Sequence, residues 1–97
     1  MPEMTFSVRW PDGDLMRCYS PSLVVQEHLS VGSTYAVGEL LAAIRTALGI
    51  ASSRVQVKYG FPCSRAQAQI VAIEQTARRF AADELTVVEE FTVMESA

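Results

Sequence analysis

The chain has 97 residues, of which 49% are hydrophobic and 20% are charged. This length suits one domain and is too short for two, and the hydrophobic content excludes an intrinsically disordered chain. The formal net charge of −3 argues against a general nucleic-acid binder, because affinity for phosphate comes from summed contacts with Lys and Arg.

The charge is distributed unevenly along the chain. Residues 40–80 contain six cations and one acid, Glu74, whereas the remainder contains two cations and ten acids. This basic middle could meet a small anion or the acidic surface of a partner. A solvated helix face is the alternative interpretation and the commoner role of surface charge.

The apolar runs are only a few residues long, far short of the roughly 20 residues that a membrane span needs. The first residues, Met1-Pro2-Glu3-Met4, lack the basic and apolar segments of a signal peptide. We therefore expect a cytoplasmic chain that does not engage a membrane. In that compartment Cys18 and Cys63 are expected to be free thiols, with a single disulfide as the rival interpretation.

Two segments predict an N-terminal hairpin. Residues 4–10 alternate between apolar and polar side chains, the period of a half-buried strand. The turn-forming sequence Pro11-Asp12-Gly13-Asp14 follows, and residues 15–19 resume as a second strand. Near the C-terminus, residues 84–94 predict a third strand. One of its faces should carry Leu85, Val87, Phe91 and Val93, with Glu89 as an exception.

The middle of the chain predicts helices. A short helix is expected over residues 21–28, although Val24 and Val25 also suit an extended segment. From Thr34 the apolar period becomes helical and continues to Leu48, where Gly49 and Ile50 resemble a helix stop. Residues 52–60 fit either a strand or a short helix, and the helix is preferred because Gly60 repeats the stop signal.

The clearest helix is expected to begin at Ser64, where Ser64 and Gln67 form a capping-box pattern. Its apolar stripe should pack on the sheet, and it consists of Ala66, Ile70, Ile73, Ala77 and Phe80. The predicted fold is therefore a single α+β domain over residues 1–97. It has a three-stranded antiparallel sheet, made of the hairpin and the C-terminal strand, covered on one face by two to four helices. Two free sheet edges would allow a homodimer.

No set of residues resembles catalytic machinery. The single histidine, His28, lies in a weakly structured segment, and nothing resembles a nucleophile elbow. Paired metal-ligand spacing and glycine-rich phosphate loops are missing as well. We therefore expect no metal and no cofactor, and we favour a non-catalytic protein over an enzyme.

Cys63 is the sharpest chemical candidate, because it immediately precedes a predicted helix, whose N-terminus lowers the pKa of a thiol. A buried, inert role is the commoner one for cysteine. The candidate ligand or partner site contains Cys63 and the cationic and aromatic residues near it in sequence, Arg54, Lys58, Tyr59 and Arg65. It also includes Trp10 and Cys18 of the predicted hairpin.

Three stretches of the sequence are distinctive together: residues 9–13 (Arg-Trp-Pro-Asp-Gly), 18–25 (Cys-Tyr-Ser-Pro-Ser-Leu-Val-Val) and 58–66 (Lys-Tyr-Gly-Phe-Pro-Cys-Ser-Arg-Ala). They resemble a small bacterial family of nitrogen-starvation-response proteins, whose genes lie in a cluster built around a nitrilase. The resemblance implies a role in scavenging nitrogen from nitriles or cyanide, alongside enzymes such as a flavin-dependent oxidoreductase. It implies no catalytic residue.

Three functions follow as hypotheses. The first is a non-catalytic accessory or interaction protein for an enzyme of that gene cluster. The second is a small-molecule-binding protein or minor enzyme with a reactive Cys63. The third is a transcriptional regulator, for which the cations Arg54, Lys58 and Arg65 are the one cue and the acidic total is the counter-argument.

Overall fold

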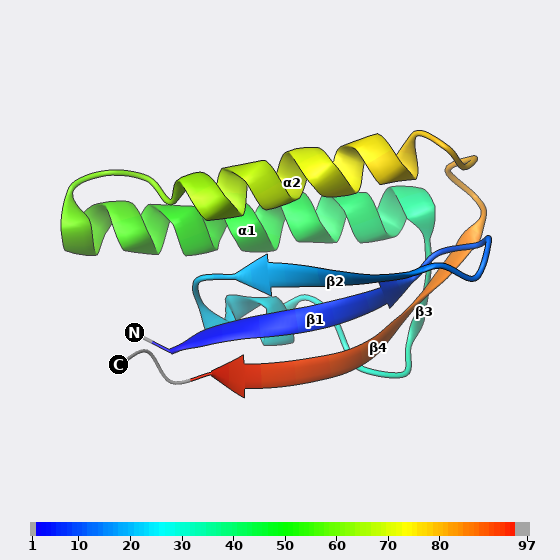
Figure 1. The fold of residues 1–97 in the computed structure, drawn as a ribbon, viewed down its shortest axis with the longest axis horizontal. Coiled ribbons are helices and arrows are strands. Elements are labelled where there is room, and N and C mark those ends of the chain that lie inside the picture. The colour runs from blue at the N-terminus through cyan, green and yellow to red at the C-terminus, as the bar shows by residue number, and fades with distance from the viewer. Residues whose placement is uncertain (1, 95–97) are drawn as a thin grey trace.

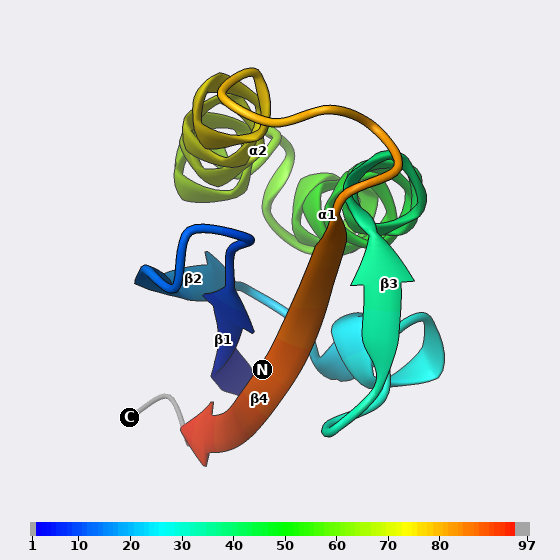
Figure 2. The same ribbon diagram turned by 90° about the vertical axis from the view of Figure 1, so that its right-hand side faces the viewer.

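A computed structural model describes residues 2–94. Two α-helices lie together on one side of an antiparallel sheet, which gives a two-layer α+β arrangement (Figures 1 and 2). The elements in chain order are β1 (Glu3–Arg9), β2 (Leu15–Ser20), the 3-10 helix η1 (Leu23–Glu27), β3 (Thr34–Ala36), α1 (Val37–Tyr59), α2 (Ser64–Ala77) and β4 (Leu85–Met94).

The hairpin and the returning C-terminal strand are confirmed. β1 pairs with β2 on one side and with β4 on the other, and both pairings are antiparallel. Met4, Phe6 and Val8 alternate along β1 and are all buried against the helices, as period-two patterning requires. β1 is therefore one of the two inner strands of the sheet, beside β4, and it contributes three side chains to the core.

The prediction of three strands is wrong, because β3 adds a fourth strand in the order β2-β1-β4-β3. β3 has only three residues, and Tyr35 pairs with Thr86 of β4. A three-residue strand is too short to show a period of two, and its residues merge into the helical pattern that follows. Thr34 is thus extended and does not begin the helix.

A β-bulge in β4 changes which residues face the core. Ser7 pairs with Glu90 and Val8 with Val88, so no residue of β1 pairs with Glu89. The predicted alternation therefore fails at this point, and both Val88 and Phe91 pack on the core. The displaced Glu89 forms an ion pair with Arg9 at 2.9 Å, and this hydrogen bond lowers the pKa of Glu89.

The predicted helix stop at Gly49 is wrong. α1 continues through Gly49 to Tyr59, so the short helix expected over residues 52–60 is the end of α1. The stop at Gly60 is confirmed, since Gly60 has a left-handed φ of +87° and its N–H donates to the carbonyl of Gln56 at 2.8 Å. A glycine followed by an apolar residue stops a helix only if its backbone turns left-handed, and Gly49 stays helical.

The remaining helical predictions hold with small changes. The segment predicted at 21–28 is the 3-10 helix η1, and it is capped by Ser22, whose Oγ accepts from the Val24 N–H. α2 begins at Ser64 as expected, but Cys63 occupies the cap position and makes no side-chain capping bond. The α2 stripe packs on α1 and β2, with Ile73 fully buried.

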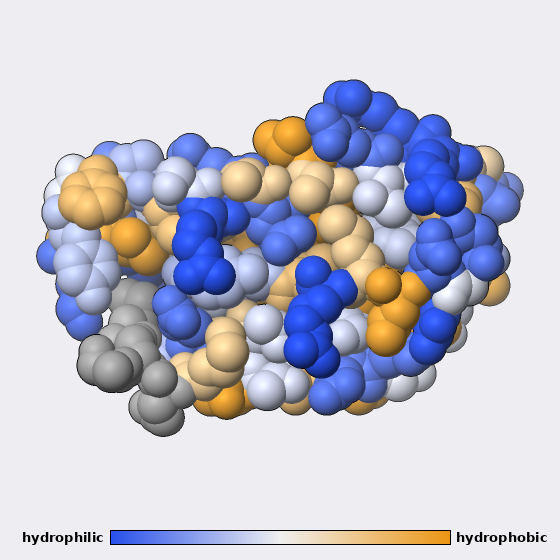
Figure 3. Space-filling model, in the orientation of Figure 1, coloured by the Kyte–Doolittle hydropathy of each residue, from blue (hydrophilic) through white to orange (hydrophobic). Residues whose placement is uncertain are grey.

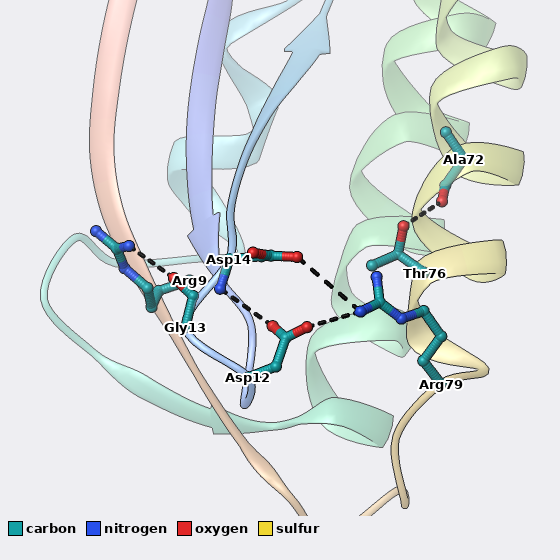
Figure 4. Close-up of polar contacts among 7 residues, drawn as sticks. All are labelled: Arg9, Asp12, Gly13, Asp14, Ala72, Thr76 and Arg79. Carbon is teal, nitrogen blue, oxygen red and sulfur yellow. Dashed lines mark hydrogen bonds and ion pairs between the residues drawn. The ribbon is translucent and has the colours of Figure 1, made fainter.

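The turn between β1 and β2 is tied to the C-terminal end of α2 (Figure 4). The Nη2 of Arg79 donates to the carboxylate of Asp12 at 2.7 Å. Within the turn, Arg9 donates to the carbonyl of Gly13 at 2.8 Å. Trp10 stacks on Phe80 beside these contacts, with 5.8 Å between ring centroids. These interactions fix one end of the helical layer on the sheet.

The continuity of α1 gives a stability prediction. Gly49→Ala should raise the free energy of unfolding by about 0.5–1 kcal/mol, because glycine is the costlier residue inside a helix. A Cβ at Gly49 would meet nothing within 4 Å. Gly60→Ala should lower the free energy of unfolding by about 1 kcal/mol, since its φ of +87° is unfavourable for alanine. Urea unfolding measures both, and a loss of stability in Gly49→Ala would contradict a continuous helix.

Candidate functional site

The candidate site is the end of the molecule where α1 meets α2, called here the helical end (residues 54–65). Figure 1 shows that this end of the helical layer extends beyond the sheet. Val55 is the last buried residue of α1, and every residue from 56 to 62 is exposed. Residues 56–62 therefore gain almost no burial from the rest of the molecule.

Three large side chains of the helical end are exposed although they are apolar or aromatic. Val57 is 89% exposed, Phe61 64% and Tyr59 53%. Figure 3 shows apolar surface at this end, beside polar side chains. Val57 and Tyr59 are two residues apart in α1 and therefore point to different sides of the helix. The three side chains thus expose apolar and aromatic surface at one end of the molecule without forming one continuous face.

The same end is cationic. No Asp or Glu occurs between Glu39 and Glu74, whereas Arg54, Lys58 and Arg65 lie in the helical end. Within residues 2–94 none of these three cations forms an ion pair. Arg54 donates to the Ser22 hydroxyl at 3.1 Å, and Lys58 lies 5.5 Å from the ring centroid of Tyr59. Their positive charge is therefore not neutralised by a neighbouring carboxylate in the described chain.

A shallow groove of about 680 Å³ runs along the exposed face of α1 into the helical end. It extends from Arg45 to Val57, with Gly49 in its middle and Ile50 beside it. All its lining residues belong to α1, on the face turned away from the core. The sequence pattern did not reveal this groove, because Gly49 was interpreted as a helix stop.

Cys63 lies at the helical end, half-buried, at the cap position of α2. Its backbone N–H donates to the Ser52 hydroxyl at 3.1 Å, a bond that joins the start of α2 to α1. Cys18 is separate and buried in β2, and burial raises the pKa of its thiol to about 12. Both cysteines are free thiols, and Cys18 is part of the core.

Tyr19 of β2 also joins the site. The guanidinium of Arg65 lies over its ring at 3.7 Å, and its hydroxyl donates to Glu3 at 2.9 Å. Burial, followed by the bond to Glu3, raises the pKa of Tyr19 to about 12. Gln69 accepts from the Tyr19 N–H, so α2 also covers part of the free edge of β2.

The structure thus brings together five of the seven candidate residues and separates two. Arg54, Lys58, Tyr59, Cys63 and Arg65 all lie at the helical end. Trp10 lies at the other end of α2, buried against Phe80, and Cys18 lies within the core. The sequence carries no local signal for Val57 and Phe61. Their exposure follows from the position of the end of α1 in the fold.

Among residues 2–94, no group of three His, Cys, Asp or Glu side chains is placed to hold a metal ion. In the same part of the chain, neither α-helix combines the length and the apolar character that crossing a bilayer requires.

These features define a small two-layer α+β protein with an apolar and cationic end. Residues 5–92 match the family described as nitrogen starvation-induced protein NitG, and the chain belongs to that family. No curated protein and no solved structure matches the chain.

The two thiols should differ in reactivity. At neutral pH one equivalent of iodoacetamide should alkylate Cys63, whereas Cys18 should react only on unfolding, because it is buried and its pKa is raised to about 12. Peptide mass spectrometry measures both rates, with Cys63→Ser as the control. Equal labelling of both cysteines in the folded protein would contradict this assignment.

Proposed function

We propose that this protein is a non-catalytic accessory protein that acts by binding another protein through its helical end. The exposure of Val57, Tyr59 and Phe61 at one end of the molecule is the observation that carries the proposal. Exposed aromatic and apolar side chains are favoured anchors of interaction surfaces. The uncompensated cations near them would select a partner with an acidic surface.

The biological setting of the proposal is nitrogen starvation, which is the condition that induces the family. We extend it to the cytoplasmic scavenging of nitrogen from nitriles or cyanide, as the sequence resemblance implies. The partner would be an enzyme of the same gene cluster, with the nitrilase and the flavin-dependent oxidoreductase as the first to test.

A small-molecule site is the second candidate function. A hollow of about 300 Å³ lies beside the Tyr19–Arg65 stack, and Gln69 also lines it. Arg65 would supply a cation to an anionic ligand there, near the half-buried thiol of Cys63. The helical end remains the stronger candidate because Val57 and Phe61 there are 89% and 64% exposed although they are apolar.

A binding experiment with purified cluster enzymes tests the proposal. The wild-type protein should bind one of them, and the double variant Val57→Ser/Phe61→Ser should bind at least tenfold more weakly. Truncation of a buried interface anchor costs about 1–2 kcal/mol, and 1.4 kcal/mol corresponds to tenfold in Kd. Surface plasmon resonance measures the affinities.

The matched control is Leu15→Ser/Val71→Ser, which removes comparable apolar groups that are 52% and 51% exposed outside the helical end. It should bind like the wild type. The proposal fails if no cluster enzyme binds, or if both double variants lose the same affinity.

A further inference from the structure

Gly49 is the one glycine whose presence the fold does not explain. Gly13, Gly32 and Gly60 have positive φ angles, which favour glycine. Gly38 packs closely on Ala82, where an added Cβ would lie 3.4 Å from the Ala82 Cβ. Gly49 has a helical backbone, and a Cβ there would point into open space. Inside the described molecule, therefore, neither conformation nor packing requires glycine at this position.

The surroundings of Gly49 are those of a helix-packing surface. The groove spans residues 45–57 of α1, which is about 18 Å, or more than three turns of a helix. Gly49 lowers its centre, while Ile50 and Val57 supply apolar walls that are 36% and 89% exposed. Helices pack by fitting side-chain ridges into such grooves, and smaller residues at the contact allow a closer approach. The backbone of α1 is hydrogen-bonded within the helix, so a strand could not pair with it.

Charge selects the occupant of the groove. Arg45 and Arg54 both line it, and Lys58 follows one turn after Arg54. Glu74 compensates the charge of Arg45 through an ion pair, whereas Arg54 bonds only the Ser22 hydroxyl. Within residues 2–94 neither Arg54 nor Lys58 forms an ion pair. A second copy that packed groove to groove by two-fold symmetry would add its own Arg54 and Lys58 to the same cationic surface, which is unfavourable. A helix with acidic flanks would instead complement them.

We infer that the groove over Gly49 binds an amphipathic helix of a partner protein, with apolar residues against Ile50 and Val57 and with Asp or Glu beside Arg54 and Lys58. This inference rests on the proposed function and specifies the chemistry of its partner. Gly49 permits the close approach, and Arg54 and Lys58, which form no ion pair within residues 2–94, set the charge preference.

Two designed helical peptides of about 21 residues test the inference. They share one stripe of Leu and Ala and differ only in carrying Glu or Lys at the flanking positions. Fluorescence anisotropy with the full chain should show that the Glu peptide binds at least tenfold more tightly than the Lys peptide. Added salt should reduce this difference, because the selectivity is electrostatic.

The decisive variant is Gly49→Leu, which fills the groove and leaves the core unchanged. It should weaken binding of the Glu peptide at least tenfold, and Ser53→Leu on the same face should act in the same direction. Gln67→Leu adds the same side chain at an exposed position of α2 and should bind like the wild type. Circular dichroism establishes that each variant folds.

Several outcomes would overturn the inference. Equal binding of the two peptides, binding of neither, or binding that survives both Gly49→Leu and Ser53→Leu would each do so. A protein that sediments with phosphatidylcholine–phosphatidylserine vesicles but ignores the Glu peptide would indicate a membrane surface instead. Self-association that Gly49→Leu abolishes would indicate a second copy.

The failure of the groove is distinguishable from the failure of the proposed function. If a cluster enzyme binds Gly49→Leu normally but does not bind Val57→Ser/Phe61→Ser, the inference about the groove is wrong and the proposed accessory function stands. If the Glu peptide binds in a way that depends on Gly49 but no cluster enzyme binds, the inference about the groove stands and the proposed enzyme partner is wrong.

Discussion

The continuity of α1 through Gly49 is the constraint on which the rest of the structure depends. A helix of 23 residues is about 34 Å long, and the last of its buried residues is Val55. Its last turn must therefore lie beyond the core, and α2 must begin there as well. Had α1 ended at Gly49, Val57 and Phe61 would belong to a separate short segment that could fold back on the sheet. The exposed end is thus a consequence of helix length.

Much of the fold could be predicted from the sequence, because the hairpin, α2 and β4 each have enough residues to show their period. The errors arose where a local pattern has two physical meanings. Gly49 followed by Ile50 looks the same as Gly60 followed by Phe61, but only Gly60 turns left-handed. The three residues of β3 are too few to show alternation, and the bulge at Glu89 depends on pairing with β1. Neither signal is local.

The site was predictable in the same partial way. Arg54, Lys58, Tyr59, Cys63 and Arg65 are close in sequence, so any hairpin of helices places them at one end. The stacking of Arg65 on Tyr19 joins residues 46 positions apart, and only the packing of α2 beside β2 produces it. Trp10 and Cys18 looked equally suitable as sequence candidates, yet the alternation of the hairpin directs both into the core. What distinguishes the candidate surface is exposure, which residue type alone does not specify.

The central claim is that this protein meets its partner through the helical end and not through the sheet. Photo-crosslinking in nitrogen-starved cells tests it most directly, with benzoylphenylalanine placed at Val57 or, for comparison, at Arg17 of the edge strand β2. The account predicts one dominant crosslinked protein from position 57 and none from position 17. Crosslinks from position 17 alone, or from neither position, would contradict it.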